Sequence, residues 1–270
     1  MGSPNWPRPF WPQRPMDKLS KKERQDVILK RLESDVAVQI APLAAELQVT
    51  TETIRRDLDQ LSERGLIART YGGAAVRSLA AEPGVATRSH AFVEERARIA
   101  ARAMALVSSG DVVMIDAGST TSHFAAALAR SELSITVITN SLGVARFLGP
   151  VETMQVVLCP GDLRATEDGV YGQETTAFLD KYRADFAFIG CGGFSAREIT
   201  DADSNAVWIK RHMLARAKTS VLIADASKAG VEQYAGVCGW SEVDTLITDA
   251  PCTDDIAAAL GAHGVETILA

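Results

Sequence analysis

Hydroxyl-bearing residues gather in one short stretch of the sequence, Asp116-Ala-Gly-Ser-Thr-Thr121, between an apolar run and an alanine-rich segment. The pattern predicts a buried strand over residues 111–117, followed by a helix that ends near Ala129. Unpaired backbone N–H groups and hydroxyls at a helix N-terminus can bind an anion such as a phosphate group. A single stretch of this kind is more often a satisfied helix cap, so its chemistry depends on what lies beside it in the fold.

Polar groups also follow the later apolar runs. In chain order these groups are Thr139-Asn140-Ser141, Gly161-Asp-Leu-Arg164, Gly190-Cys-Gly-Gly193 and Asp225-Ala-Ser-Lys228. Runs rich in Val and Ile alternate with helical segments as far as Ala270, and residues 154–163 are expected to form one of the strands. This alternation predicts an α/β domain with a doubly wound, mostly parallel sheet covered on both faces. Ligands bind beyond the carboxyl ends of such strands, so the polar groups together indicate a pocket.

A second set of residues whose types could carry a function lies in the run TTETIRRDLDQL, residues 50–61. Three apolar residues at helical spacing predict one buried face, namely Ile54, Leu58 and Leu61. Thr50 or Thr51 can cap the helix N-terminus. Arg55 and Arg56 lie about 100° apart around the helix, so one is expected to reach base edges and the other phosphate. Such a helix suits a DNA major groove, and an ordinary surface helix with a solvated charged face is the competing interpretation.

The segments around this helix favour the DNA-binding interpretation. They predict helices over residues 21–33 and 42–47, a short extended piece over residues 36–40, and a two-stranded ribbon over residues 66–76. Helix, helix, turn, helix and ribbon in this order are typical of a winged helix-turn-helix. The sequence therefore predicts a DNA-binding domain over residues 18–77.

The strings TIRRDL (residues 53–58) and YGGA (residues 71–74) together resemble the N-terminal domain of DeoR-family transcriptional repressors. Members of that family commonly carry His at the position of Tyr71, and tyrosine keeps a flat polar ring there. The resemblance implies double-stranded operator DNA as a partner. The residues expected to contact it are Thr50, Thr51, Thr53, Arg55, Arg56, Tyr71, Gly72 and Gly73.

Residues 91–270 resemble the effector domain of the same family, which is in turn similar to ribose-5-phosphate isomerase. The resemblance implies a phosphorylated sugar or polyol as the ligand, with its phosphate held by residues 118–121. Asp116, Asn140 and Lys228 are then expected to face hydroxyls or phosphate, and two further residues are expected to act as second cations. The full expected set is Asp116, Gly118, Ser119, Thr120, Thr121, Asn140, Ser141, Arg164, Lys210 and Lys228.

These resemblances imply a repressor of a sugar or polyol catabolic operon that a phosphorylated ligand releases. The alternative is an isomerase-like enzyme with an added DNA-binding module. Residues 190–193 lack the acidic cluster of the isomerase, and Lys210 lies near the position of its glutamate base. Proton abstraction beside a carbonyl needs a base that titrates near neutrality, and an ordinary lysine is protonated there. We therefore expect no catalytic residues. A protein-interaction adaptor is a third possibility, which the adjacent arginines and the glycine wing disfavour.

Composition limits the remaining classes of protein. The 270 residues carry a formal net charge of -6, which argues against a generally basic nucleic-acid binder but allows a local basic surface. The four cysteines form no CxxC pair and the four histidines do not cluster near them, so no metal, cofactor or disulfide is expected. The absence of a long apolar run and of a signal-peptide pattern predicts no membrane partner and a cytoplasmic location.

The domain boundaries follow from changes in composition. Residues 1–17 are rich in Pro and Trp and are expected to form a disordered tail, and residues 78–90 are expected to link the two domains. A single winged helix buries too little surface for tight, specific DNA binding. Since paired half-sites remedy this, a homodimer or homotetramer is expected.

Overall fold

The computed structural model describes residues 20–34, 37–63, 66–70, 73–76, 84–89 and 91–270. The chain divides into two compact units, Met1–Arg77 and Ser78–Ala270, and each is described by itself. The expected tail and residues 78–83 of the expected linker lie outside the described residues. None of the described helices is long and apolar enough to cross a membrane.

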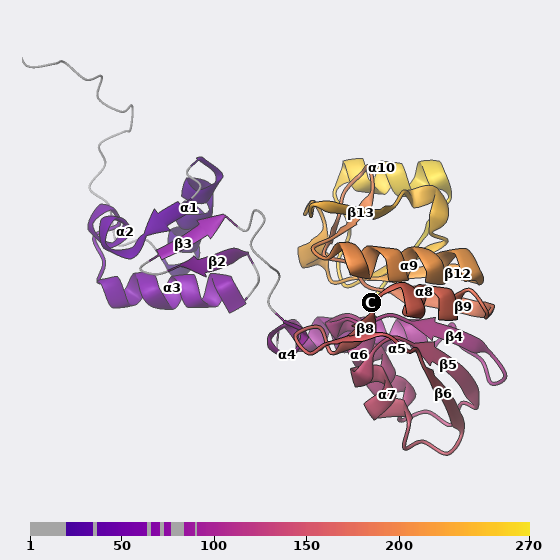
Figure 1. The fold of residues 1–270 in the computed structure, drawn as a ribbon. Helices are drawn as coiled ribbons and strands as arrows, with labels where there is room; N and C mark the ends of the chain where they lie inside the picture. Colours follow the sequence, from indigo (N-terminus) through magenta and orange to yellow (C-terminus); the bar gives the residue numbers. More distant parts are fainter. Residues whose placement is uncertain (1–19, 35–36, 64–65, 71–72, 77–83, 90) are drawn as a thin grey trace, which may run out of the picture. The chain divides into compact units, whose positions relative to one another are not determined.

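The N-terminal unit is a small helical domain with one antiparallel sheet (Figure 1). Its elements are α1 (Lys21–Ser34), β1 (Ala37–Gln39), α2 (Ile40–Glu46), α3 (Thr51–Glu63), β2 (Ile67–Thr70) and β3 (Gly73–Val76). β2 and β3 form the ribbon expected from the sequence. β1 also pairs with β3, so the sheet has three strands in the order β1-β3-β2. The helices and the wing confirm the winged helix-turn-helix prediction.

Helix α3 is held in place by its apolar face and by one buried ion pair. Ile54, Leu58 and Leu61 are fully buried, as the helical spacing predicted. Asp57, between them, is also buried and pairs with Arg24 of α1, with Arg24 Nη2 lying 3.2 Å from Asp57 Oδ1. Removing one partner of a buried pair leaves an uncompensated charge, so this contact fixes α1 against α3. The aspartate of the TIRRDL string therefore orients the helix from its inner side.

The C-terminal unit is built on a parallel sheet of seven strands in the order β15-β14-β12-β9-β4-β5-β6. The strands are β4 (Val112–Ile115), β5 (Ile135–Thr139), β6 (Met154–Leu158), β9 (Ala184–Ile189), β12 (Ala217–Ile223), β14 (Thr245–Thr248) and β15 (Glu266–Leu269). The helices are α4 (Val85–Arg88), α5 (Val93–Met104), α6 (Ser119–Leu128), α7 (Leu142–Leu148), α8 (Gln173–Leu179), α9 (Ser204–Arg216) and α10 (Asp254–His263). The doubly wound fold expected from the sequence is confirmed.

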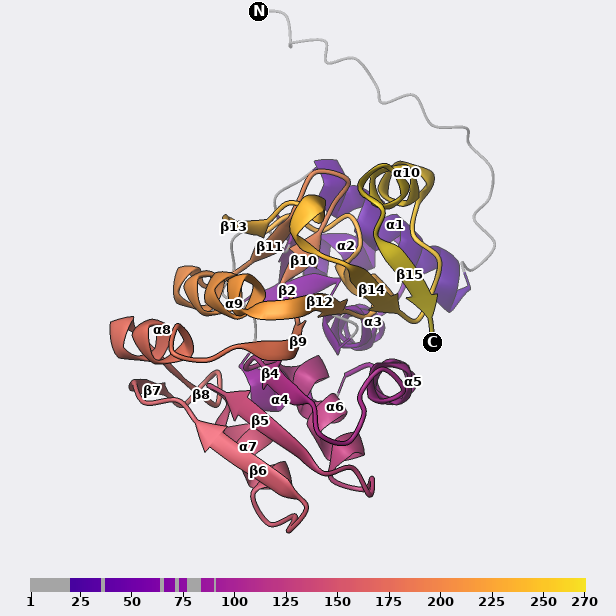
Figure 2. The same cartoon turned by 90° about the vertical axis from the view of Figure 1, so that its right-hand side faces the viewer.

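Helices cover both faces of this sheet (Figures 1 and 2). Val113 and Ile115 of β4 pack in a core with α5, α6 and α7. Met114, between them, packs in a second core with α8 and α9. Because successive strand residues point to opposite faces, a continuous apolar run is what a doubly covered strand requires.

The strand order reverses between β4 and β9. The chain first moves outward from β4 to β5 and β6, and then returns to β9 on the other side of β4 before moving outward again. The connections on the two sides place α6 and α7 on one face and α9 on the other. A crevice forms beyond the carboxyl ends of the strands at such a switch point.

Two smaller sheets lie at this end of the fold. β7 (Asp162–Arg164) and β8 (Gly169–Tyr171) form a hairpin, and β10 (Gly193–Phe194), β11 (Ile199–Asp201) and β13 (Ala235–Cys238) form an antiparallel sheet. The prediction of one strand over residues 154–163 is wrong. Pro160 cannot donate to a ladder and Gly161 has a φ of 147°, so the strand ends and the chain turns into β7.

Candidate functional site

The N-terminus of α3 is capped by a threonine at the start of the exposed surface. Thr50 Oγ1 accepts a hydrogen bond from the backbone N–H of Thr53 at 3.1 Å, and the two hydroxyls lie 2.8 Å apart. Thr50 and Thr51 are exposed and Thr53 is half-buried. Gly73 begins β3, whereas Tyr71 and Gly72 lie outside the described residues.

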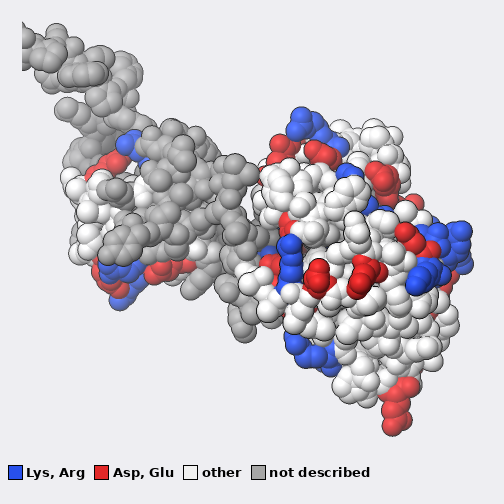
Figure 3. Space-filling model, in the orientation of Figure 1, with Lys and Arg blue, Asp and Glu red and all other residues white. Residues whose placement is uncertain are grey.

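Arg55 and Arg56 lie on the outer side of α3. Their side chains are 53% and 76% exposed, and both contact Glu52, at 2.7 Å from Arg55 Nη1 and 3.2 Å from Arg56 Nε. The helical wheel separates the two arginines by about 100°, yet one carboxylate holds both because Glu52 is three and four residues away. Figure 3 shows basic and acidic side chains side by side along this edge of the unit. On this surface, the guanidinium groups of Arg55 and Arg56 are both paired with the exposed carboxylate of Glu52.

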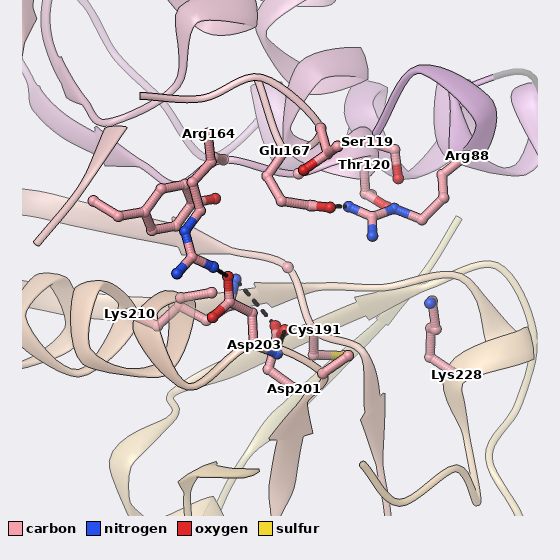
Figure 4. Close-up of a pocket in the computed structure, with 17 residues that line it drawn as sticks. Arg88, Ser119, Thr120, Arg164, Glu167, Cys191, Asp201, Asp203, Lys210 and Lys228 are labelled. Atoms are coloured by element: carbon pink, nitrogen blue, oxygen red, sulfur yellow. Dashed lines mark hydrogen bonds and ion pairs between the residues drawn. The ribbon is translucent and has the colours of Figure 1, made fainter. Parts of the chain in front are cut away.

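A cavity of about 230 Å³ opens at the β4–β9 switch point (Figure 4). Six residues expected from the sequence line it: Gly118, Ser119, Thr120, Arg164, Lys210 and Lys228. Lining residues that the expected set did not include are, among others, Arg88, Glu167, Tyr171, Cys191, Asp201 and Asp203, and of these six only Cys191 lies in a polar group noted in the sequence. The lining therefore carries four basic and three acidic side chains.

Helix α6 points its N-terminus into this cavity. Its N-cap is Gly118, an extended glycine, so no side chain caps the first turn. The carbonyl of Gly118 accepts hydrogen bonds from the Thr121 and Ser122 hydroxyls at 3.1 and 2.7 Å. Gly118, Ser119 and Thr120 line the cavity, so the first turn brings backbone N–H groups and two hydroxyl-bearing residues to it, which is an arrangement suited to an anion.

Lys210 forms the most buried charge cluster of the site. Its Nζ donates to Asp116 and lies 3.4 Å from Asp201 Oδ2, and Asp116 also accepts the backbone N–H of Gly190 at 3.2 Å. Burial disfavours the ammonium, but the charges of Asp116 and Asp201 outweigh it and raise the pKa of Lys210 above its ordinary value. Lys210 is therefore a charged side chain with two carboxylate partners. Asp116 lies behind it, fully buried, and does not line the cavity.

Three other expected residues have structural partners and do not line the cavity. Thr121 is fully buried with its hydroxyl on the Gly118 carbonyl, and Ser141 Oγ accepts from the backbone N–H of Val144 as the cap of α7. Asn140 donates to the Val170 carbonyl at 3.1 Å, while its Oδ1 is buried and has no hydrogen-bond partner among the described residues. The sequence predicted the correct edge of the sheet for these residues, but it did not predict that their side chains lie away from the cavity.

The reasons why Arg88 and Asp203 were not among the expected residues differ. Arg88 lies in the segment expected to be a linker, where no periodic pattern marks an element, and it pairs with Glu167 at 2.8 Å. Asp203 pairs with Arg164 and caps α9 by accepting from the backbone N–H of Asn205 at 2.9 Å. An aspartate before a helical run is a common N-cap signal, so Asp203 was within reach of the sequence argument.

Comparisons with known proteins agree for both units. Residues 24–79 match the family model of the DeoR-like helix-turn-helix domain, and residues 91–250 match that of the DeoR C terminal sensor domain. The chain is 30% identical over 249 residues to the glycerol-3-phosphate regulon repressor of Escherichia coli (strain K12), covering 92% of this chain and 98% of that protein. It is 32% identical over 252 residues to the HTH-type transcriptional repressor GlcR of Bacillus subtilis (strain 168), covering 93% and 97%.

Among solved structures, the ribose 5-phosphate isomerase A of Methanocaldococcus jannaschii is 20% identical, with a TM-score of 0.39. The match covers 52% of this chain and 55% of that one. A match of this size adds no argument about the site.

The Lys210 cluster predicts a large stability effect. Lys210→Met should lower the free energy of unfolding by about 3–5 kcal/mol, because it leaves Asp116 buried without its cation. Adding Asp116→Asn should restore part of that loss, which a double-mutant cycle in urea, followed by circular dichroism, would measure. Lys218→Met is the control, because Lys218 pairs with Asp185 at the surface, where its side chain is 79% exposed. Equal losses in Lys210→Met and Lys218→Met would contradict this account.

Proposed function

The chain belongs to the DeoR family of transcriptional regulators, and we propose that a phosphorylated sugar or polyol in the α6 cavity releases it from operator DNA. The observation that carries this proposal is the uncapped N-terminus of α6, which faces a cavity lined by four basic side chains. A helix N-terminus carries roughly half a positive charge, and its first N–H groups lack helical partners. A phosphate group would satisfy these donors, with Ser119 and Thr120 adding hydroxyls.

The same cavity offers partners for a polyhydroxylated body. Asp201 and Asp203 supply carboxylate acceptors on the wall opposite Ser119 and Thr120 (Figure 4). Buried polar groups that hydrogen-bond a substrate hydroxyl reject an analogue without it, so these aspartates would contribute to the choice of sugar. The curated relatives are named for a glycerol-3-phosphate regulon and for other operons, which supports this ligand class without identifying the sugar.

The protein is a regulator and not an enzyme. Its relatives are named as repressors. Each carboxylate of the cavity is held by a basic side chain, with Glu167 on Arg88, Asp203 on Arg164 and Asp201 on Lys210. By the resemblance, Lys210 lies near the position of the isomerase's glutamate base, and its two carboxylates keep it charged. An enzyme would convert pentose phosphates between aldose and ketose forms on incubation, and we expect no such conversion.

DNA binding is assigned to α3 and the wing. The two exposed arginines of α3 share Glu52, and a phosphate or a guanine edge would replace that carboxylate. Ligand binding can release DNA only if the ligand binds the DNA-competent and released arrangements with different affinities, since equal affinity shifts nothing. We propose that the protein acts in the cytoplasm, where operator DNA is available to it.

Arg55 and Arg56 should separate into a specificity contact and a backbone contact. Ala at the base-reading position should cost about 1–3 kcal/mol of binding free energy and relax specificity at one base pair. Ala at the phosphate-contacting position should weaken all sequences alike and flatten the salt dependence. Gel shifts with DNA upstream of the gene would measure both effects, with Lys30→Ala on the exposed side of α1 as the control. Unchanged operator affinity in the double variant would refute the assignment.

Thr120→Val should leave operator binding intact and abolish the response to sugar phosphates. The substitution keeps the side-chain volume close to that of Thr120 and removes a hydroxyl from the cavity wall. Titrating the operator complex with glycerol 3-phosphate, ribose 5-phosphate and glucose 6-phosphate tests this. Ser122→Ala is the matched control, because its hydroxyl lies on the same helix but not in this cavity. A Thr120→Val protein that responds at the wild-type concentration would place the phosphate elsewhere, and a wild type released only by unphosphorylated sugars would remove the phosphate assignment.

We also propose a homodimer or homotetramer, with contacts made mostly by the sheet domain and α5. One winged helix buries too little surface for tight specific binding, and a second copy on a paired half-site supplies the rest. Light scattering at micromolar concentration should report more than one chain per particle. A monomer both with and without DNA is the contrary result.

A further inference from the structure

Helix α4 is tied to the loop that closes one side of the cavity. The backbone N–H of Val85 donates to the Thr166 carbonyl at 2.9 Å, and the Arg88 guanidinium lies 2.8 Å from Glu167 Oε2. Gly84 approaches so closely that a Cβ there would lie 2.8 Å from the Thr166 oxygen. Thr166 and Glu167 belong to the turn of the β7–β8 hairpin, and both line the cavity. These contacts couple the position of α4 to that of the β7–β8 turn, which forms one wall of the cavity.

A buried arginine ties the end of α4 to a second wall. Arg96 of α5 is 2% exposed and donates to the carbonyls of Arg88 and Ala91. The same guanidinium donates to Asp225 Oδ2 at 3.1 Å. Asp225 precedes the single turn of 3₁₀ helix that carries Lys228 into the cavity. The Arg96 guanidinium thus links the loop that carries Lys228 to the carbonyl groups at the end of α4.

A third contact reaches α6 itself. His123, four residues after Ser119 along α6, has its Nε2 3.3 Å from the Ser89 carbonyl, one residue after the end of α4. Two parts of the cavity wall, α6 and the hairpin turn, thus contact residues 85–89 directly, and the Lys228 loop is linked to Arg88 and Ala91 through Arg96. Residues 77–83, which connect this segment to the N-terminal unit, lie outside the described residues.

The Arg88–Glu167 pair lies beside the expected phosphate position. Figure 4 shows Arg88 and Glu167 on the same wall as Ser119 and Thr120, with Lys228 across the cavity. The side chains of the pair are 12% and 22% exposed, so solvent screens them less than a surface pair. A phosphate ester carries about two negative charges and three acceptor oxygens near neutral pH, whereas Glu167 offers one charge. Phosphate is therefore the stronger partner for a guanidinium that both can reach.

We propose that Arg88 is a phosphate-binding residue and that the effector takes it from Glu167. This inference rests on the proposed function and assigns the residue that carries the signal out of the cavity. The exchange removes the side-chain link between α4 and the hairpin turn, leaving the Val85 hydrogen bond to Thr166, while the phosphate draws Arg88 toward α6. Because α4 is the first described element after the connection to the DNA-binding unit, a shift of Arg88 would change the point from which that connection starts. Arg88 is then both a ligand contact and the coupling residue.

Two substitutions in the full-length chain test the exchange in opposite directions. Arg88→Ala removes the phosphate contact and should raise the Kd for the active sugar phosphate by about tenfold or more. Glu167→Gln keeps the shape and removes the competing charge, so it should lower that Kd by up to about tenfold. Calorimetry with glycerol 3-phosphate, ribose 5-phosphate and glucose 6-phosphate gives both values. The matched control is Asp168→Asn, which removes the neighbouring carboxylate that pairs with Arg146 outside this cavity and should leave the Kd unchanged.

Coupling is read from operator release at saturating sugar phosphate. Arg88→Ala should release a smaller fraction of the operator than wild type even when the cavity is full, because the coupling contact is missing. Full release at saturation would make Arg88 a ligand contact only and overturn the coupling. Wild-type Kd values in both variants would overturn the exchange while leaving the proposed function in place. If wild type binds none of the three sugar phosphates, the proposed effector class fails and this inference fails with it.

Discussion

The arrangement of the effector unit depends on the buried contact of Lys210 with Asp116 and Asp201. A buried charge is tolerated only when it is paired and hydrogen-bonded, so the three side chains must meet whenever the unit is folded. Asp116 follows β4, Asp201 ends β11, Lys210 lies on α9, and the backbone of Gly190 at the end of β9 donates to the same carboxylate. The cluster therefore fixes the ends of three strands and the middle of α9 at the point where the strand order reverses.

The Lys210 cluster differs from the other charged groups of the cavity, because its three side chains are fixed whereas the arginines can exchange partners. Lys210 is 3% exposed and held by two carboxylates, which makes it a poor candidate for direct ligand binding. The two arginines of the cavity differ from Lys210, because Arg88 pairs with Glu167 on a loop and Arg164 pairs with Asp203 at a helix end. A ligand can replace such a partner without leaving a charge buried in the protein interior. Under the proposed function, the Lys210 cluster would keep the shape of the cavity constant, and a ligand would act on the chain through the arginine pairs.

The sequence predicted the elements well because their signals are local. The spacing of Ile54, Leu58 and Leu61 defines the buried face of α3, and continuous Val and Ile runs define the parallel strands. The anion site at Gly118–Thr120 could also be proposed locally, since a glycine and hydroxyls between a strand and a helix are visible in any window, and it remains a prediction.

The partners of the buried charges were out of reach for a physical reason. Lys210 and Asp116 are 94 residues apart, and they meet because β9 inserts beside β4, which no local pattern reveals. Arg88 was hidden in a stretch without periodicity, whose position depends on contacts with Thr166 and Glu167 instead of on its own sequence.

At both candidate binding surfaces, a carboxylate of the chain already holds the arginines. Glu52 holds two arginines of α3, and Glu167 pairs with Arg88, so a phosphate bound as proposed at either place would exchange one anion for another. The binding free energy is then the difference between two charge-assisted contacts, which is small for a lone anion. Affinity would then have to come from the groups around the phosphate, namely base edges at α3 and sugar hydroxyls in the cavity, and this requirement would make both sites selective on a chain whose net charge is -6.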